Sequence, residues 1–169
     1  MKIQVGCNFE TFKQYYEALW GTLGETEADY IQQNPAHLII IKENEHIIGD
    51  MIWHESNTQE HKPGNPRSKE DSAILLRLLG DHQEFIELHE VWLRKEYRGK
   101  GYGKKMFAFF EQFIRQQGFK TAIYYAYNPA AIAICRHRKY REAGCIEIEG
   151  IEGNREAMHV FHIALLKNK

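Results

Sequence analysis

A glycine-rich, basic segment, Glu96–Lys105 (EYRGKGYGKK), is the part of the sequence that most restricts how the chain can fold. Glycine stands at positions 99, 101 and 103, after an apolar strand pattern and before a helical one. A strand that passes through glycines into a helix directs unpaired backbone N–H groups and the positive end of the helix dipole at one point. This arrangement is typical of a site that binds phosphate groups.

Two common phosphate-binding motifs do not fit this segment. A P-loop needs glycine at position 98 and Ser or Thr at position 105, but Arg98 and Lys105 occupy these places. A dinucleotide-binding GxGxxG pattern needs glycine where Lys104 stands, and it belongs nearer the start of a chain. The pattern that remains is RxxGxG, which runs from Arg98 to Gly103.

The charge distribution supports an anion site in this part of the chain. Residues 94–141 carry a net charge of +10, whereas residues 1–93 carry −9 and residues 142–169 carry −2. We expect the basic part to attract an anionic ligand and the acidic part to suit a cationic one. The whole chain is nearly neutral, at −1, and shows no alternation of aromatic and basic residues on a sheet, so a nucleic-acid partner is not expected.

Hydrophobic periodicity predicts one α/β domain over residues 1–169, in the order β, helices, ββ, β, α, β, α, ββ. Asn8 is the predicted N-cap of the first helix and Gly21 its end. Residues 56–71, with Pro63 and Pro66, are predicted to form a mobile polar loop. The predicted strands cover residues 3–7, 37–42, 46–55, 85–93, 121–127, 145–150 and 158–166, and the helices cover residues 9–20, 26–33, 106–118 and 128–144. Residues 73–80 are predicted to form either a short helix or an insertion segment.

Composition points to a cytoplasmic protein. The three cysteines (Cys7, Cys135 and Cys145) show no CxxC spacing, which is typical of reduced thiols rather than of disulfides or a metal centre, so we expect no metal. No apolar run approaches the roughly 20 residues that cross a bilayer, and the start of the sequence has no signal-peptide pattern. We therefore expect no membrane partner.

In this context the RxxGxG segment resembles the acetyl-CoA cradle of the GNAT superfamily of N-acetyltransferases. The run VWLRKEYRGKGYGKKM is similar to the family's strand, loop and pyrophosphate-binding helix, and TAIYYAYNPAAIAI to its next strand and helix. YREAGC resembles the family's Tyr-x-x-x-Gly-aromatic ending, with Cys145 in place of the aromatic residue. The resemblance implies the GNAT fold, a mixed and mostly antiparallel central sheet of about six or seven strands, flanked by helices and splayed at the fourth and fifth strands.

The resemblance implies an N-acetyltransferase that uses acetyl-CoA as cosubstrate and acetylates a primary amine of a small molecule or peptide by direct attack. The alternative is a non-catalytic acyl-CoA-binding sensor of the same fold. The amine is expected to be a cation, and the oligomeric state is left open, a homodimer included. The residues implied in cofactor binding are Val91, Trp92, Leu93, Arg98, Gly99, Lys100, Gly101, Tyr102, Gly103, Lys104 and Asn128.

Two parts of the chain supply candidates for proton transfer: the strand before the cradle and the segment after Asn128. Glu87 and Glu90, on the strand before the cradle, are candidates for accepting the ammonium proton, with His89 as a further possibility on that strand. Tyr140 is the candidate for protonating the leaving thiolate. Family members often separate the Asn and the Tyr by seven positions, but Tyr140 lies twelve after Asn128, and Cys135 stands at the sevenfold spacing. An insertion that extends or bulges the helix would reconcile the two spacings, and the choice between Tyr140 and Cys135 stays open.

Overall fold

The computed structural model of the chain describes residues 1–59, 67–149, 153 and 155–165. The strands are β1 (Lys2–Val5), β2 (Leu38–Glu43), β3 (His46–Asn57), β4 (Glu84–Leu93), β5 (Thr121–Ala126), β6 (Arg141–Glu149) and β7 (Arg155–Ala164). The helices are α1 (Phe9–Trp20), α2 (Glu25–Gln33), α3 (Lys69–Leu79), α4 (Tyr102–Gln116) and α5 (Pro129–His137), with 3-10 turns η1 (Pro35–His37) and η2 (Lys95–Tyr97). This order of elements confirms the predicted alternation. None of the helices in these described ranges has the length and apolar character needed to span a bilayer.

The strands form a seven-stranded sheet in the order β1-β2-β3-β4-β5-β7-β6. Pairing is antiparallel for β1 with β2, β2 with β3, β5 with β7 and β6 with β7, whereas β4 and β5 are parallel. The predicted mixed, mostly antiparallel α/β class is confirmed, while the splay of the fourth and fifth strands stays a prediction. The chain forms two compact units, Met1–His54 with Leu88–Phe109 and Glu55–Glu87 with Phe110–Lys169. The assignment of residues 1–169 to one domain stays a prediction.

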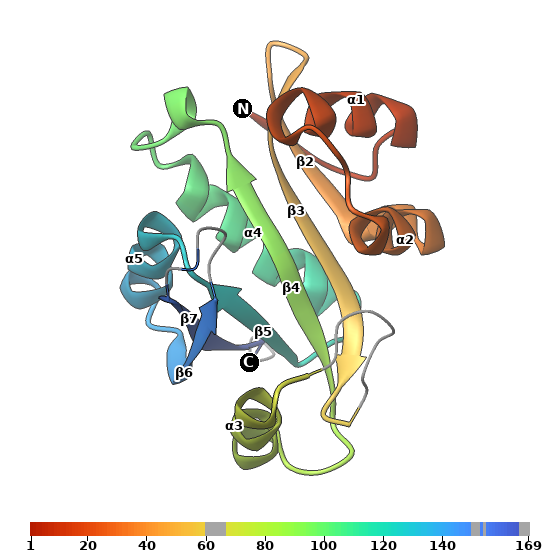
Figure 1. Cartoon of the computed structure of the whole chain (residues 1–169). Helices are drawn as coiled ribbons and strands as arrows, with labels where there is room; N and C mark the ends of the chain where they lie inside the picture. The colour runs from red at the N-terminus through yellow and green to blue at the C-terminus, as the bar shows by residue number, and fades with distance from the viewer. Residues whose placement is uncertain (60–66, 150–152, 154, 166–169) are drawn as a thin grey trace. The chain divides into compact units, whose positions relative to one another are not determined.

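In the first unit, α1 and α2 lie beside β2 and β3 (Figure 1). The side chain of Asn8 accepts a hydrogen bond from the Thr11 N–H and caps α1, which ends at Gly21 with a left-handed φ of 87°. Both predicted helix ends are therefore confirmed. The core that joins these elements consists of Phe12, Leu23, Tyr30, Ile31, Leu38, Ile40, Ile47 and Ile52. Because the core takes side chains from both helices and both strands, its burial holds α1 and α2 against one face of the hairpin.

In the second unit, α3 begins at Lys69, four residues before the predicted start at Ala73. The Ser68 side chain accepts a hydrogen bond from the Asp71 N–H and caps the helix. The predicted loop over residues 56–71 is therefore wrong at both ends, since β3 also runs to Asn57. Residues 60–66, which include both prolines, lie outside the described residues, and so does the mobility predicted for them. The core of this unit consists of Ile74, Leu75, Phe85, Ile123, Ile146 and Val160.

The predicted helix over residues 128–144 is wrong in its second half. Helix α5 ends at His137, and the chain from Arg141 onward belongs to β6. The helix is continuous over its nine residues, so the predicted extension or bulge is not seen. Tyr140 lies beyond the end of the helix rather than within it.

A turn after α5 explains this early end. The N–H of Lys139 donates to the Arg136 carbonyl at 3.0 Å, and the N–H of Tyr140 donates to the Cys135 carbonyl at 3.1 Å. These two bonds define a Schellman motif, with Lys139 in left-handed backbone at φ 60°. Glycine is usual at this position, and because lysine stands here the sequence gives no sign that the helix stops.

Gly49 lies where β3 approaches the end of β4, inside the first unit. A Cβ at Gly49 would lie 2.6 Å from the carbonyl oxygen of Trp92 and 3.4 Å from the Cα of Leu93. Just beside this point the N–H of Arg94 donates to the carbonyl of Ile48 at 2.8 Å. The absence of a side chain at Gly49 therefore permits the spacing of these two strands.

We expect Gly49→Ala to force the two strands apart and to lower the free energy of unfolding by about 1–3 kcal/mol, as overpacking does elsewhere. Urea denaturation measures the loss, and hydrogen exchange of the Arg94 amide should become faster. Unchanged stability together with unchanged Arg94 protection would contradict this account of Gly49.

Candidate active site

The glycine-rich turn lies between η2 and α4 in the first unit. Gly99 and Gly101 are exposed and have left-handed φ values of 75° and 82°. Helix α4 begins at Tyr102, and the N–H of Lys105 donates to the Gly101 carbonyl at 3.3 Å. The N–H groups of residues 102–104 precede this bond and therefore have no acceptor within the helix.

The space beside this turn is open to a ligand. A Cβ added at Gly99 or at Gly101 would meet no heavy atom within 4 Å. Exposed Lys100 and Lys104 add positive charge, and the Lys100 ammonium lies 5.4 Å from the centre of the Tyr97 ring. Backbone donors, cations and open space in one place suit a phosphate group.

Arg98 joins the turn to the end of β4. Its Nε donates to the Leu93 carbonyl at 2.8 Å, and its guanidinium carbon lies 4.4 Å from the centre of the Trp92 ring. These contacts give Arg98 a role in holding the turn in shape. The predicted binding of the cofactor by Arg98, and by the backbone of Val91, Trp92 and Leu93, stays a prediction.

Tyr102 holds the start of α4 in place. Its hydroxyl donates to Glu43 at 3.4 Å, and its ring stacks on Tyr97 with centres 6.3 Å apart. Glu43 also pairs with the N-terminal amino group of Met1 at 2.9 Å. The first turn of α4 is thereby connected to the end of β2.

Two carboxyl groups, Glu90 of β4 and Asp50 of β3, lie together in the first unit beside α1. The Tyr16 hydroxyl donates to Glu90 Oε2 at 3.1 Å. Asp50 is 0% exposed, and among the described residues its oxygens have no hydrogen-bond partner other than the Glu90 carboxyl group, while the Tyr15 hydroxyl has none. Burial, followed by the charge of Glu90, raises the pKa of Asp50 well above its ordinary value.

Sequence reasoning identified Glu90 but missed Asp50. The signal was present, because Asp50 is the one acidic residue within the apolar run IIGDMIW. Ile48, Met51 and Ile52 around it are buried, so an acid at this place must be buried too. A buried acid in a strand interior is expensive and often functional.

His89, the further candidate base on β4, already has partners. Its Nε2 lies 2.9 Å from Glu27 Oε1, and its ring centre lies 5.4 Å from that of Tyr30. The hydrogen bond from His89 lowers the pKa of Glu27. These contacts connect β4 to α2.

Glu87 belongs to the second unit and lies near a buried network centred on Arg67. The Arg67 guanidinium donates to Asp71 at 2.8 Å, to the Tyr125 hydroxyl at 3.1 Å and to the Ser56 hydroxyl at 2.9 Å. Burial, then the charges of Asp71 and Glu87, raise the pKa of Tyr125. Glu87 therefore acts on a network that also holds α3 to β5.

Tyr140 and Cys135 also belong to the second unit. The Tyr140 hydroxyl accepts from Arg138 Nε at 2.8 Å, and Arg138 pairs with Glu111. Burial raises the pKa of Tyr140, and it raises that of Cys135 to about 12, so both groups keep their protons at neutral pH. Cys135 is 0% exposed whereas Tyr140 is only partly buried, which favours Tyr140 as the group that a substrate can reach.

Asn128 caps α5. Its side-chain oxygen accepts from the Ala130 N–H at 2.8 Å, so the observed contact is structural. Its predicted contact with the cofactor stays a prediction. The first unit thus brings together the predicted residues 90–93 and 98–104, while Glu87, Asn128 and Tyr140 lie in the second unit.

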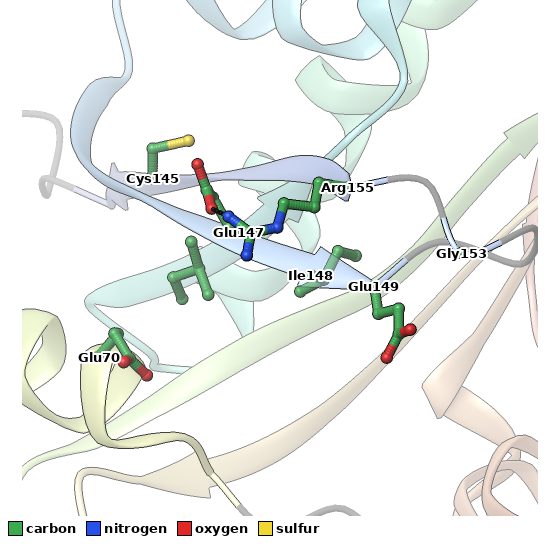
Figure 2. Close-up of a pocket in the computed structure, with 8 residues that line it drawn as sticks. Glu70, Cys145, Glu147, Ile148, Glu149, Gly153 and Arg155 are labelled. Atoms are coloured by element: carbon green, nitrogen blue, oxygen red, sulfur yellow. Dashed lines mark hydrogen bonds and ion pairs between the residues drawn. The ribbon is translucent and has the colours of Figure 1, made fainter.

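The second unit also has a pocket of about 670 Å³ (Figure 2). Arg155 pairs there with Glu147 at 3.2 Å, and both side chains are largely exposed. None of the residues predicted from the sequence lines this pocket. Its lining consists of Glu70, Cys145, Ile146, Glu147, Ile148, Glu149, Gly153 and Arg155.

The sequence of the chain matches the model of the acetyltransferase (GNAT) family over residues 8–140. The chain therefore belongs to the GNAT family. No curated protein sequence matches it at a significant level.

Solved structures share the fold at low sequence identity. Polyamine N-acetyltransferase of Drosophila melanogaster is 10% identical with a TM-score of 0.71, and the match covers 96% of this chain and 100% of that one. Arylalkylamine N-acetyltransferase 2 of Aedes aegypti is 10% identical with a TM-score of 0.71, covering 98% and 99%. The yncA protein of Salmonella typhimurium, solved with its cofactor acetyl-CoA, is 13% identical with a TM-score of 0.67, covering 100% and 96%. At these identities the likeness establishes the GNAT fold.

Gly101→Val should reduce affinity for acetyl-CoA by about tenfold or more, because the added side chain fills the space where phosphate would approach the backbone. Gly21→Val is the matched control, since Gly21 has a similar φ of 87° and also no atom within 4 Å of an added Cβ. Both variants carry left-handed strain of about 1–3 kcal/mol, but only Gly101→Val should lose affinity in a binding titration. Equal affinities for the two variants would remove the turn from the cofactor site.

Proposed function

We propose that the protein is an acetyl-CoA-dependent N-acetyltransferase that acetylates a primary amine of a small molecule or peptide by direct attack. The observation that carries this proposal is the open, left-handed turn at Gly99 and Gly101 before α4, in a chain of the GNAT family. We further propose a cytoplasmic location, because the cysteines have the pattern of reduced thiols.

The residues of the turn fit acetyl-CoA. The N–H groups of residues 99–104 would hold its pyrophosphate, with Lys100 and Lys104 as nearby cations, because a Cβ added at Gly99 or Gly101 meets only open space. When bound, acetyl-CoA supplies an acetyl group activated as a thioester. Arg98 and Tyr102 keep the turn in shape through their contacts with Leu93 and Glu43.

The protein's part in the reaction is proton transfer. In our proposal the acceptor ammonium gives a proton to a carboxylate of β4, and the neutral nitrogen then forms a bond to the acetyl carbon as the carbon–sulfur bond breaks. Glu90 is the favoured base because its carboxylate is partly exposed and is oriented by the Tyr16 hydroxyl, and Glu87 is the second candidate. The Tyr140 hydroxyl is proposed to donate a proton to the leaving sulfur, since burial keeps it protonated.

The acceptor is proposed to be a cation at neutral pH. Residues 1–93 carry a net charge of −9, and the candidate bases are carboxyl groups within this part of the chain. Structural neighbours include a polyamine N-acetyltransferase and an agmatine N-acetyltransferase, at 10% and 12% identity. A positively charged primary amine is the class of acceptor that both observations support.

We expect acetyl-CoA-dependent release of free thiol with at least one member of a panel of primary amines. Glu90→Gln should lower kcat/KM by about 10²–10⁴-fold, the range of general base catalysis, and leave acetyl-CoA affinity unchanged. Glu87→Gln on the same strand is the matched comparison and should cost less. A larger loss of kcat/KM in Glu87→Gln than in Glu90→Gln would identify Glu87 as the general base. Acetyl-CoA binding without thiol release with any amine of the panel would favour a non-catalytic sensor.

Tyr140→Phe should lower kcat by about 10²-fold while acetyl-CoA affinity stays the same, because the phenol acts only on the leaving group. Cys135→Ala is the control on the neighbouring turn, and it should cost about 1 kcal/mol of stability through a small cavity but keep kcat. Steady-state kinetics with the best amine of the panel measures both. If Cys135→Ala loses kcat and Tyr140→Phe does not, the assignment of the proton donor is wrong.

A further inference from the structure

We propose that Asp50 and Glu90 act as one proton-sharing carboxyl pair that binds the acceptor's ammonium group and takes up its proton, beside an aromatic wall formed by Tyr16, Trp20 and Trp92. Glu90 meets the amine, and Asp50 is a positioning residue that acts through Glu90. This inference rests on the proposed function and names the part of the first unit that receives the amine.

The burial of Asp50 is the first argument. Its side chain has no exposed surface, and among the described residues its oxygens have no hydrogen-bond partner other than the carboxyl group of Glu90. An ionised carboxylate in such a place is strongly destabilised, so Asp50 is expected to hold a proton or to lie beside a cation. Arg94, a basic residue whose charge acts on Tyr15 beside this site, is already paired with Glu96 at 2.8 Å.

The closeness of Glu90 is the second argument. Burial, then the charge of Glu90, raises the pKa of Asp50. Two neighbouring carboxyl groups cannot both ionise easily, so the resting pair holds one proton and one negative charge. Glu90 is partly exposed, whereas Asp50 is not, so a ligand can reach only Glu90.

The surroundings keep this site negative. Burial and the charge of Glu90 raise the pKa of Tyr16, and burial and the charge of Asp50 raise that of Tyr15, so both phenols stay neutral. The titratable and charged groups that face the pair or its two tyrosines are Tyr15 and Tyr16 from α1, Glu27 from α2, and Arg94 and Glu96 after β4. With Arg94 paired to Glu96, an external cation would balance the negative charge of this site.

The aromatic wall suits the carbon chain of an amine. The Trp20 ring lies 6.4 Å from Tyr16 and 4.6 Å from Trp92, between ring centres, and Trp20 is 50% exposed. Trp92 shares a face of β4 with Glu90, since side chains alternate along a strand. Arg98 already lies over the Trp92 ring, so we place the ammonium at Glu90 and the apolar carbons against Trp20.

The number of protons gained and lost by the carboxyl pair is equal over one turnover. An arriving ammonium replaces the shared proton, which leaves to water, and the pair becomes doubly negative around one cation. The ammonium next gives one of its protons to the pair through the partly exposed Glu90 carboxylate, which leaves a neutral amine and restores the singly protonated pair. The attacking nitrogen loses its second proton when the amide forms. The leaving sulfur takes up one proton in the same step, so these two changes cancel.

The test counts protons rather than products. Calorimetric titration of 2-phenylethylamine into the protein with CoA, at neutral pH in buffers of different ionisation enthalpy, should show about one proton released per amine bound. Asp50→Asn removes the acid that shares the proton, so the release should fall to about zero and kcat/KM should fall with it. Asp29→Asn, which removes the same charge from an exposed place on α2, should keep wild-type values, and 2-phenylethanol, which lacks the ammonium, should release none.

A second measurement needs no amine. Because the folded pair holds its proton more tightly than the unfolded chain does, its stabilising contribution is complete below about pH 4 and is lost as pH rises through the raised pKa. The melting temperature of the wild type should therefore fall with rising pH relative to that of Asp50→Asn. The proposal of a proton-sharing pair would be wrong if the melting temperatures of the two proteins changed equally with pH. It would also be wrong if the wild type bound the amine without releasing a proton. Proton release on binding without acetylation of any amine would keep the pair and reject the proposed function instead.

Discussion

The close approach of β3 and β4 at Gly49 sets the geometry on which the candidate site depends. With only 2.6 Å between the place of a Cβ and the Trp92 carbonyl, no larger residue fits at Gly49 without moving the strands. The next residue along β3 is Asp50, and Glu90 lies two residues before Trp92 on β4. The close approach of β3 and β4 at Gly49 and Trp92 therefore has two effects. It brings Asp50 and Glu90 together, and it fixes the position of the end of β4, from which the chain continues into the glycine-rich turn.

The turn itself is held by contacts that need no ligand. Arg98 donates to Leu93 and covers the Trp92 ring, and Tyr102 reaches Glu43 from the first turn of α4. These contacts order the backbone on both sides of Gly99 and Gly101. A preordered turn loses less conformational entropy when an anion binds, so more of the interaction energy remains as affinity. Arg98, the first residue of the RxxGxG pattern, thus has a structural reason to be arginine.

The sequence was sufficient wherever the signal was local. The Asn8 cap, the end of α1 at Gly21, the turn between β2 and β3 and the family itself all follow from residues close together in the chain. The end of α5 was missed because Lys139 adopts a backbone conformation that normally indicates glycine. The start of α3 was missed although Ser68 and Asp71 have the spacing of a capping pair. These errors concern where elements end, and they leave the fold class unchanged.

The candidate site could not be predicted from local signals alone. A comparison of the two buried aspartates among the described residues, Asp71 and Asp50, explains why. Asp71 lies against the Arg67 guanidinium at 2.8 Å and the Tyr125 hydroxyl at 2.8 Å, so its charge is balanced inside the second unit and its role is structural. Asp50 stands within an apolar run instead; it faces the carboxyl group of Glu90 and, among the described residues, has no other hydrogen-bond partner. Tyr16, which orients Glu90, lies 74 residues away in the chain, so only tertiary structure shows the contact. A buried acid that the fold leaves uncompensated favours a ligand that brings the missing positive charge, and an ammonium group brings both that charge and the proton that the reaction must remove.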